Sequence, residues 1–451
     1  MDIRLRALNR FGLGARVGQK SQISDVRGWL KGQLESPLSA GVQGPSLAER
    51  GRIVTDLRSA QRSQDQDALA DVRARIRDLQ SADFGRLLDR RVTTDRPFAE
   101  RLVAFWSNHL CVSIEAKRQV AILAGHYEDD VIRRHALGSF TEMVLASAKH
   151  PAMLFYLDNL QSIGPGSRAG RQTARRGTAR GLNENYAREL LELHTVGVRG
   201  GYQQADVEAL ARILTGWTVA GVGPGARPGE GLGFAFRAIL HEPGTKSVLG
   251  RRYRNGGLGE GEAVIRDLCA HPATASFVAE KLVRHFVDDE PPIEAVATIA
   301  DVFESTEGDL RAVSRALVDL EAAWDPDHVK FRTPQDWLTA VFRAVHAEEA
   351  PEPMAPLLRQ LRHTPWAPAA PKGFGDSRRE WADPDSLMNR AELARSVARR
   401  AGQGGGLDPR MLADVMDVDA GDPLLTMLAD SSIPARERLA LAFGGPAFQW
   451  R

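Results

Sequence analysis

The feature that most constrains the fold of this chain is the scarcity of strand-like alternation in its sequence. Alternating β-branched and aromatic residues are rare, whereas Ala, Leu, Arg and Glu are abundant, which is typical of helices. The best strand candidates are FAFRAIL and KSVLGRRY, both within the glycine-rich stretch 218–261. The sequence therefore predicts an all-α protein, more than half helical, with a small glycine-rich β-hairpin insertion.

Charge and cysteine count exclude several classes of protein. Lys and Arg total 59 against 58 Asp and Glu, so the net charge of +1 gives no reason to expect nucleic acid as a ligand. Two cysteines are too few for a disulfide framework or a four-cysteine zinc site. No apolar run approaches the ~20 residues that span a bilayer, and the first residues lack the apolar core of a secretory signal. We expect a cytoplasmic protein from the sequence as written, or an exported one if a signal was removed.

Proline, glycine and charge divide the chain into three parts. Its 451 residues suggest two or three domains on a prior of roughly 150 residues each. We predict an N-terminal helical segment over 1–91, with a long polar helix at about 51–91, and a main helical domain over 92–345. A proline-rich linker and accessory helices are expected over 346–451.

The stretch NENYARELLELHTVG is the richest in groups that could carry chemistry. Read as a helix, it places His194 on an apolar face, whereas Glu184, Arg188 and Glu192 form a separate strip at i, i+4 and i+8. The simplest explanation of that strip is an exposed arginine held between two carboxylates. A helix start with free backbone N–H groups also suits a ligand. The other polar residues of the stretch are Asn183, Asn185 and Glu189.

His109 is a second inward-pointing histidine. It follows Phe105 and Trp106 by four and three residues and stands beside Asn108, so its ring is expected on the apolar face of a helix. A lone buried histidine is most often a hydrogen-bonded core residue. Because burying it without a partner would cost several kcal/mol, we predict that His109 and His194 share one polar cluster. That cluster should hold at least one of Glu184, Glu189 and Asp158.

Further polar groups lie in loops or at helix ends. Asp158 and Asn159 are most simply residues of a turn. His241 and Lys246 lie in HEPGTKSVLG at the tip of the proposed hairpin, where they could contact an anion. Other histidines near helix ends are interpreted as caps or as partners of the helix dipole: His150, His271 and His285.

Residues 161–182 carry five arginines and no acidic residue. A connection of this length is either disordered or functional, and we interpret it as a disordered surface loop that proteases cut early. A lid over an anionic ligand and a nucleic-acid contact are the alternatives, although the absence of interleaved aromatic residues argues against base stacking. The arginines are Arg168, Arg171, Arg175, Arg176 and Arg180.

Several long motifs resemble one bacterial family, the family catalogued as domain of unknown function 1800. They include FWSNHLCVS, RRHALGSFTEMV, HPAMLFYLDN, GLNENYARELLELHTVGV, HEPGTKSVLG and HPATASFVAEKLVRHFV, and together they cover most of the chain. The resemblance implies a fold class and motif positions, but no reaction. It also implies a partner, a sulfatase-like family protein encoded nearby (domain of unknown function 1501), and export in many members.

These observations give two hypotheses of function. In the first, the chain is an enzyme with a buried His/Glu/Asn site between helices that takes a divalent metal or an anionic substrate. The catalytic candidates are His109, Glu184, Arg188, Glu189 and His194. The binding candidates are Asn108, Asp158, Asn159, Asn183, Asn185, His241 and Lys246. In the second, the chain is a non-catalytic scaffold or partner protein, and the same polar residues form a structural network. A pocket that reaches His109, Glu184 and His194 would favour the enzyme.

Overall fold

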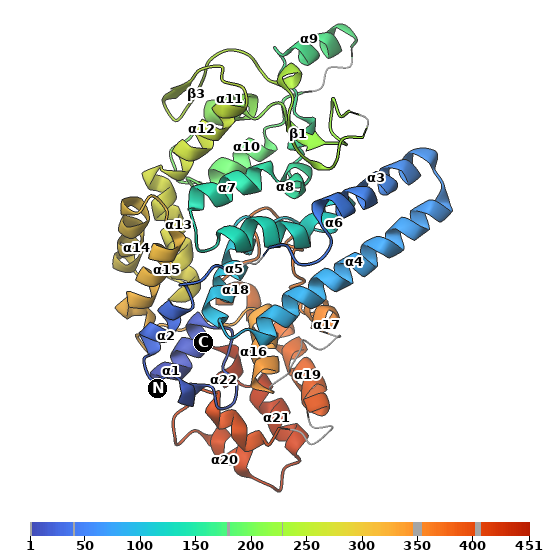
Figure 1. The fold of residues 1–451 in the computed structure, drawn as a ribbon. Coiled ribbons are helices and arrows are strands. Elements are labelled where there is room, and N and C mark those ends of the chain that lie inside the picture. Colours follow the sequence, from blue (N-terminus) through green and yellow to red (C-terminus); the bar gives the residue numbers. More distant parts are fainter. Residues whose placement is uncertain (1, 39–40, 178–180, 228, 346–353, 402–406) are drawn as a thin grey trace.

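A computed structural model describes the chain except for residues 1, 39–40, 178–180, 228, 346–353 and 402–406. Helices hold more than half of the described residues, so the predicted all-α fold is confirmed (Figure 1). The glycine-rich insertion contains two antiparallel two-stranded sheets where one hairpin was expected. The first pairs β1 (Trp217–Ala220) with β2 (Gly233–Phe236), and the second pairs β3 (Lys246–Val248) with β4 (Arg251–Tyr253).

The N-terminal part forms short helices and one long helical hairpin. The structure has two antiparallel helices where one long polar helix was expected, because the chain turns at Gln64, whose φ of 56° is left-handed. Figure 1 shows this hairpin projecting from the body of the molecule. The elements are α1 (Ile3–Arg6), the π-helical turn η1 (Ala7–Phe11), η2 (Lys20–Gln22), α2 (Val26–Gly32), α3 (Leu47–Ser63) and α4 (Gln66–Thr93).

Two of the central helices begin with residues that favour a helix start. Pro151 occupies the first turn of its helix, and the Thr333 hydroxyl accepts the backbone N–H of Asp336 as an N-cap. These central elements are α5 (Pro97–His109), α6 (Arg118–Tyr127), η3 (Glu128–Arg133), α7 (Phe140–Lys149), α8 (Pro151–Tyr156), η4 (Asn159–Gln161), α9 (Arg168–Arg175), α10 (Asn185–Glu189), η5 (Leu190–His194), α11 (Gln204–Ile213), η6 (Ala238–Leu240), α12 (Leu258–Cys269), α13 (Pro272–Phe286), α14 (Ile293–Ser305), α15 (Leu310–Asp319), η7 (Glu321–Ala323) and α16 (Pro334–Ala344).

The last helices pack beneath this body, and the two ends of the described chain lie close together in Figure 1. Residues 364–377, between α17 and α18, cross back over α5 as an irregular strap. The division of the chain near residues 91 and 345 stays a prediction. The elements are α17 (Met354–Gln360), α18 (Arg378–Trp381), α19 (Pro384–Ala401), η8 (Pro409–Asp414), α20 (Pro423–Ala429), α21 (Ala435–Gly444) and α22 (Pro446–Gln449).

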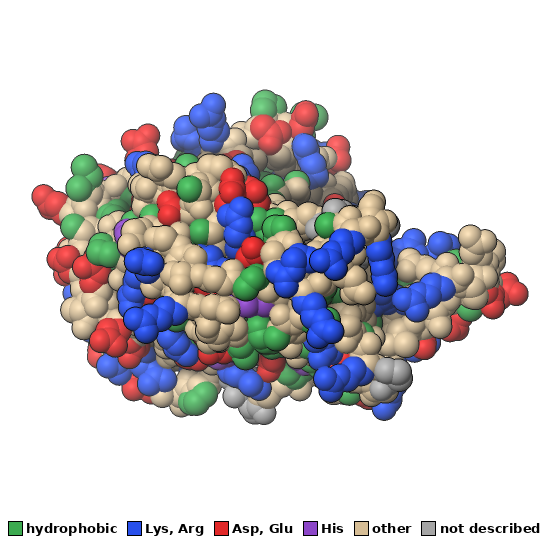
Figure 2. Space-filling view, turned by 90° about the horizontal axis from the view of Figure 1, so that it is seen from above, with side chains coloured by type: hydrophobic (Ala, Val, Ile, Leu, Met, Phe, Trp, Pro, Cys, Tyr) green, Lys and Arg blue, Asp and Glu red, His purple; other side chains and the backbone are tan. Residues whose placement is uncertain are grey.

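Part of the predicted disordered arginine loop is helical. Residues 168–175 form α9, capped by the Ser167 hydroxyl, which accepts the backbone N–H of Gly170. The Glu242 carboxylate accepts the backbone N–H of Gly166 and so fixes the base of the helix to the β insertion. Figure 2, which views this end of the molecule, shows many Lys and Arg side chains on the surface. Arg180 lies outside the described residues.

One buried carboxylate links three distant parts of the chain. Asp336 of α16 lies 3.0 Å from the guanidinium of Arg101 on α5 and 3.8 Å from that of Arg451. Burial alone would raise the pKa of Asp336, but the attraction of Arg101, Arg451 and His285 holds it well below the usual range. The ionised carboxylate therefore stabilises the fold.

We expect Asp336→Asn to lower the free energy of unfolding by about 3–5 kcal/mol at pH 7, since two buried cations lose their partner. A depressed folded-state pKa stabilises the fold above the unfolded value of ~3.9, and this contribution is lost as pH falls below that value. The difference from wild type should therefore shrink between pH 5 and pH 3 in urea unfolding. Asp319→Asn, which removes an exposed partner of Lys31, is the control and should cost less than about 1 kcal/mol. An equal loss for both variants would contradict the role of Asp336.

Candidate functional site

A cavity of about 220 Å³ opens between α5, α13 and the strap. At about 30 Å³ per water molecule it has room for roughly seven waters, the size of a small metabolite. Its wall combines aromatic rings, histidines, cations and two carboxylates. The polar lining residues include Arg91, Arg101, Asn108, His109, Lys281, Arg284, His285, Asp336, His363, Lys372 and Asp376.

Helix α13 supplies the central part of this wall. It begins at His271, whose Nδ1 accepts the backbone N–H of Ala273, so the predicted capping role of this histidine is confirmed. One face of the helix packs into the core, and Phe286 at its end is fully buried. Lys281 and His285 are four residues apart and therefore share one face, which borders the cavity.

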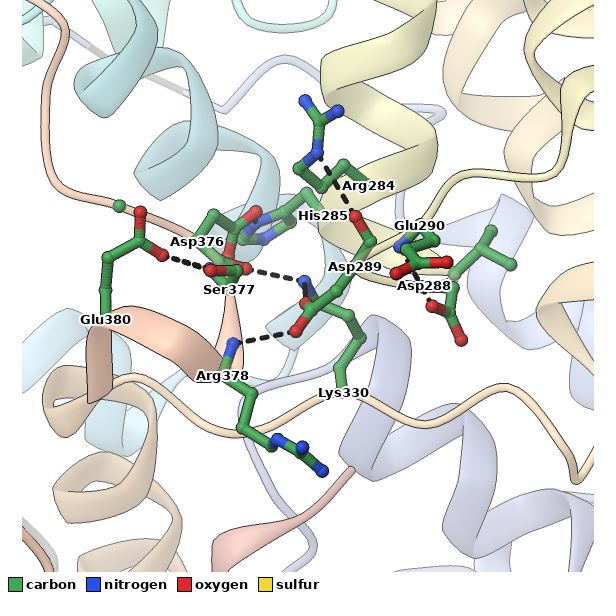
Figure 3. A network of polar contacts seen from close by, with 12 residues as sticks. Arg284, His285, Asp288, Asp289, Glu290, Lys330, Asp376, Ser377, Arg378 and Glu380 are labelled. Carbon is green, nitrogen blue, oxygen red and sulfur yellow. Dashed lines mark hydrogen bonds and ion pairs between the residues drawn. The ribbon is translucent and has the colours of Figure 1, made fainter. Parts of the chain in front are cut away.

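His285 and Asp376 form a hydrogen-bonded pair on the cavity wall (Figure 3). Nδ1 of His285 donates to Oδ2 of Asp376 over 2.8 Å, which fixes the proton on Nδ1 and leaves the lone pair on Nε2. Nε2 is shielded from solvent and has no hydrogen-bond partner among the described residues. His285 lies in the last turn of α13, but its ring bonds no helix carbonyl, so of its two predicted roles the one as a cap is wrong.

The surroundings of the pair set its ionisation. Burial lowers the pKa of His285, and the nearby Asp376 only partly reverses this effect. Burial alone would raise the pKa of Asp376, but attraction to His285 and to Lys330 holds this pKa well below the usual range. The Lys330 ammonium also donates to the backbone carbonyl of Asp376 over 2.6 Å. At neutral pH the pair is therefore a neutral imidazole beside an ionised carboxylate.

A second polar chain joins α13 to α5 and η5. The Lys281 ammonium donates to Nδ1 of His109 over 2.9 Å, and Nε2 of His109 donates to the backbone carbonyl of His194 over 3.2 Å. That carbonyl is at the end of η5, where helical acceptors lack partners within the helix. Burial and then the Lys281 charge lower the pKa of His109 well below its usual value. Burial also lowers the pKa of His194 to about 3, so both imidazoles are neutral.

The strap is held against α5 by an amide clamp. The Asn108 side chain donates to the carbonyl of Phe374 over 2.9 Å and accepts the N–H of Phe374 over 2.7 Å. Gly373 precedes this contact with a φ of +81°, and a Cβ there would lie 2.5 Å from the Asn108 carbonyl oxygen. The backbone N–H of Ile114 donates to the carbonyl of Trp366 over 2.8 Å. These contacts fix the outer wall of the cavity.

The family model described as "Protein of unknown function (DUF1800)" matches residues 6–450. The chain belongs to the DUF1800 family. No curated protein matches the chain, and no solved structure does. In the described part of this DUF1800 chain, no helix is both long enough and apolar enough to cross a membrane.

The polar residues of the NENYAREL motif in this DUF1800 chain are half-buried or exposed, whereas Tyr186, Ala187 and Leu190 are buried. Arg188 is 3.7 Å from Glu184 and 3.4 Å from Glu192, the arrangement that the sequence predicts for an exposed strip. Gln204 of α11 bridges the strip, because its amide donates to Glu184 and accepts from Arg188. Glu189 is half-buried, and burial together with Glu192 raises its pKa. None of these residues lines the cavity.

The asparagines and Asp158 have structural contacts. Asn183 donates to the carbonyl of Leu157 over 3.1 Å and accepts the N–H of Asn185 over 2.9 Å, whereas the Asn185 side chain is exposed. Asp158 has a left-handed φ of 62° and pairs with Lys117 at 2.7 Å. Asn159 is buried, and its amide donates to two backbone carbonyls next to β1.

His241 is buried, whereas the sequence placed it at an exposed hairpin tip. Its Nδ1 donates to the backbone carbonyl of Thr215 over 2.9 Å. Its Nε2 lies 3.1 Å from the Glu260 carboxylate, and the Lys246 ammonium lies 3.2 Å from the same carboxylate. The cause is α12, which brings Glu260 beneath the β insertion and draws both side chains inward. This cluster is away from the cavity.

His126, Asp130 and His150 place three possible metal-ligand atoms within 4.8 Å of one another. Nδ1 of His150 accepts the backbone N–H of Ala152, which confirms its predicted capping role and assigns its proton to Nε2. Nε2 then donates to Nδ1 of His126 over 3.0 Å. Because this hydrogen bond occupies the nitrogens that would bind a metal, the contacts favour a structural pair.

No sequence motif indicates that Lys281, His285 and Asp376 share a site. The spacing of four residues in EKLVRHF does place Lys281 and His285 on one helix face. Asp376, however, follows GFG in a segment without periodicity, 91 residues from His285. Of the catalytic and binding candidates from the sequence, only His109 and Asn108 line the cavity.

We expect Asn108→Ala to release the strap and lower the free energy of unfolding by about 1–3 kcal/mol, because two backbone groups of Phe374 lose their partners. Amide hydrogen exchange in residues 366–376 should accelerate while exchange in α6 stays unchanged. The matched control is Asn185→Ala, whose side chain is exposed. Unchanged exchange in the strap of Asn108→Ala would show that other contacts hold it.

Proposed function

We propose that this DUF1800 protein is an enzyme that binds a small anionic molecule in the cavity and transfers a proton to His285 as general base. The observation that supports this most strongly is that His285, a residue of the cavity wall, has an Nε2 without a hydrogen-bond partner among the described residues and has Asp376 on its Nδ1. Asp376 would orient the imidazole and stabilise the imidazolium that forms when Nε2 takes a proton. A neutral imidazole at physiological pH is the form that this role needs.

The charge of the wall supports an anionic ligand. Five cationic side chains border the cavity against the carboxylates of Asp336 and Asp376. Asp336 is engaged by Arg101, and Asp376 by His285. Lys281 and Lys372 have no carboxylate within ion-pair distance among the described residues, so a bound carboxylate or phosphate would supply the missing negative charge.

The cavity also bears on the choice between enzyme and scaffold. It reaches His109, which supports a binding site, but it does not reach Glu184 or His194. The proposed catalytic role therefore moves from the NENYAREL residues to α13 and the strap. The exposed Glu184–Arg188–Glu192 strip fits the scaffold hypothesis better, as part of a surface network.

The family resemblance supplies two further proposals. One is a partner from the sulfatase-like family catalogued as domain of unknown function 1501, which co-purification from the native cell would test. The other concerns the compartment, because the resemblance implies export in many members. Fractionation of cells that express the gene at its natural level would test it.

The first test of the enzyme proposal is the ionisation of His285. We expect its imidazole resonance, assigned by its loss in His285→Gln, to titrate below the usual value of ~6.5. Asp376→Asn should lower this pKa further, because the carboxylate that favours the imidazolium is removed. A pKa above the usual value in the wild type would contradict a neutral base at pH 7.

The second test is anion binding. Small carboxylates and phosphate esters, screened at pH 7, should raise the melting temperature and shift the His285 resonance. Lys372→Gln should weaken both effects, whereas Arg199→Gln, at an exposed site away from the cavity lining, should not. If no anion of the panel shifts the His285 resonance, the anion-binding part of the proposal is wrong.

A further inference from the structure

Lys281 is an unusual lysine because it is partly buried on the cavity wall with no carboxylate within ion-pair distance among the described residues. In the part of the chain that the structure describes, its ammonium contacts only Nδ1 of His109 and the ring of Phe277, whose centroid is 5.5 Å away. Lysines buried in this way lose their proton easily, since the charged form is poorly solvated. Consistently, burial lowers the pKa of Lys281 to about 8.

The hydrogen bond to His109 leaves the amine free to react. Nε2 of His109 donates to the His194 carbonyl, so Nδ1 carries only a lone pair and can only accept from Lys281. A neutral Lys281 would donate one N–H to His109 and keep its own lone pair unengaged. His285 lies one helical turn further along the same face, with the free Nε2 described above.

We propose that Lys281 is a nucleophile that forms an imine with the carbonyl carbon of a small anionic aldehyde or ketone, such as a 2-oxo acid. This inference rests on the proposed function and names the class of its substrate. It also assigns separate roles to the two groups on α13, the amine as nucleophile and His285 as base. The cations of the wall would hold the carboxylate of the substrate.

The step balances without any further reagent. The lone pair of the Lys281 nitrogen forms the C–N bond, and the C=O electron pair moves to oxygen, which takes up a proton from the solvent. The nitrogen gives a proton to Nε2 of His285, which returns it to the hydroxyl group as that group leaves as water. The iminium that results draws electrons from the neighbouring carbon, so His285 can next remove a C–H proton there.

Reductive trapping with glyoxylate tests this inference. The full chain, incubated at pH 7 with glyoxylate and cyanoborohydride, should gain one carboxymethyl group at Lys281, located by peptide mass spectrometry. At this pH an amine with a pKa of about 8 is neutral roughly 200 times more often than a lysine with a pKa of ~10.4. The trapping rate should rise with pH through a midpoint near 8, and His285→Gln should slow it.

Two variants control the trapping experiment. Lys281→Arg keeps the positive charge but cannot form an imine, so it should abolish the modification while retaining the circular dichroism spectrum of the wild type. Lys372→Arg removes an exposed lysine at the same cavity and should leave modification of Lys281 in place.

The outcomes separate the inference from the proposed function. Modification spread over surface lysines, with Lys281 unmodified, overturns the inference. If glyoxylate then still shifts the His285 resonance, the cavity binds the anion and the proposed function stands. If glyoxylate neither modifies Lys281 nor shifts His285, and no other anion shifts it, both are wrong.

Discussion

Buried guanidinium groups are the constraint on which the rest of this structure depends. Arg10, Arg332 and Arg451 are buried where the N-terminal helices, α13, α16 and the last residues meet. Most of their donors bond to backbone carbonyls: Arg10 to those of Phe286 and Val287, and Arg451 to those of Arg10 and His285. Burial lowers the pKa of Arg10 to about 8 and that of Arg332 to about 9. These side chains can be buried only if distant backbone segments meet, so the arginines specify the arrangement of the helices.

The same contacts position the candidate site. Arg451 holds the backbone carbonyl of His285 at 2.9 Å, and Lys330 holds that of Asp376 at 2.6 Å (Figure 3). Cations of the core therefore hold the backbone of both residues of the pair, while the two side chains meet at the cavity. A base that is held in this way loses little entropy when a ligand binds.

The sequence predicted local structure well and long-range pairing poorly, for a physical reason. The His150 and His271 caps and the Glu184 strip all depend on residues within one or two helical turns. The pairing of His285 with Asp376 depends instead on how the strap returns to α5. That path is set by the Asn108 clamp and the left-handed Gly373, which have no periodic signal. His241 was misplaced for a similar reason, because its partner Glu260 comes from the next helix.

Desolvation explains why the cavity is suited to chemistry at neutral pH. Burial acts in one direction on the bases of its wall, lowering the pKa values of His109, Lys281 and His285. Burial alone would raise the pKa of Asp376, but there the neighbouring His285 and Lys330 outweigh it. One environment therefore produces neutral imidazoles, a lysine with a lowered pKa and an ionised acid that supports them. Exposure to bulk water would remove both effects, so the strap that closes the outer wall is as much a part of the site as the groups on α13.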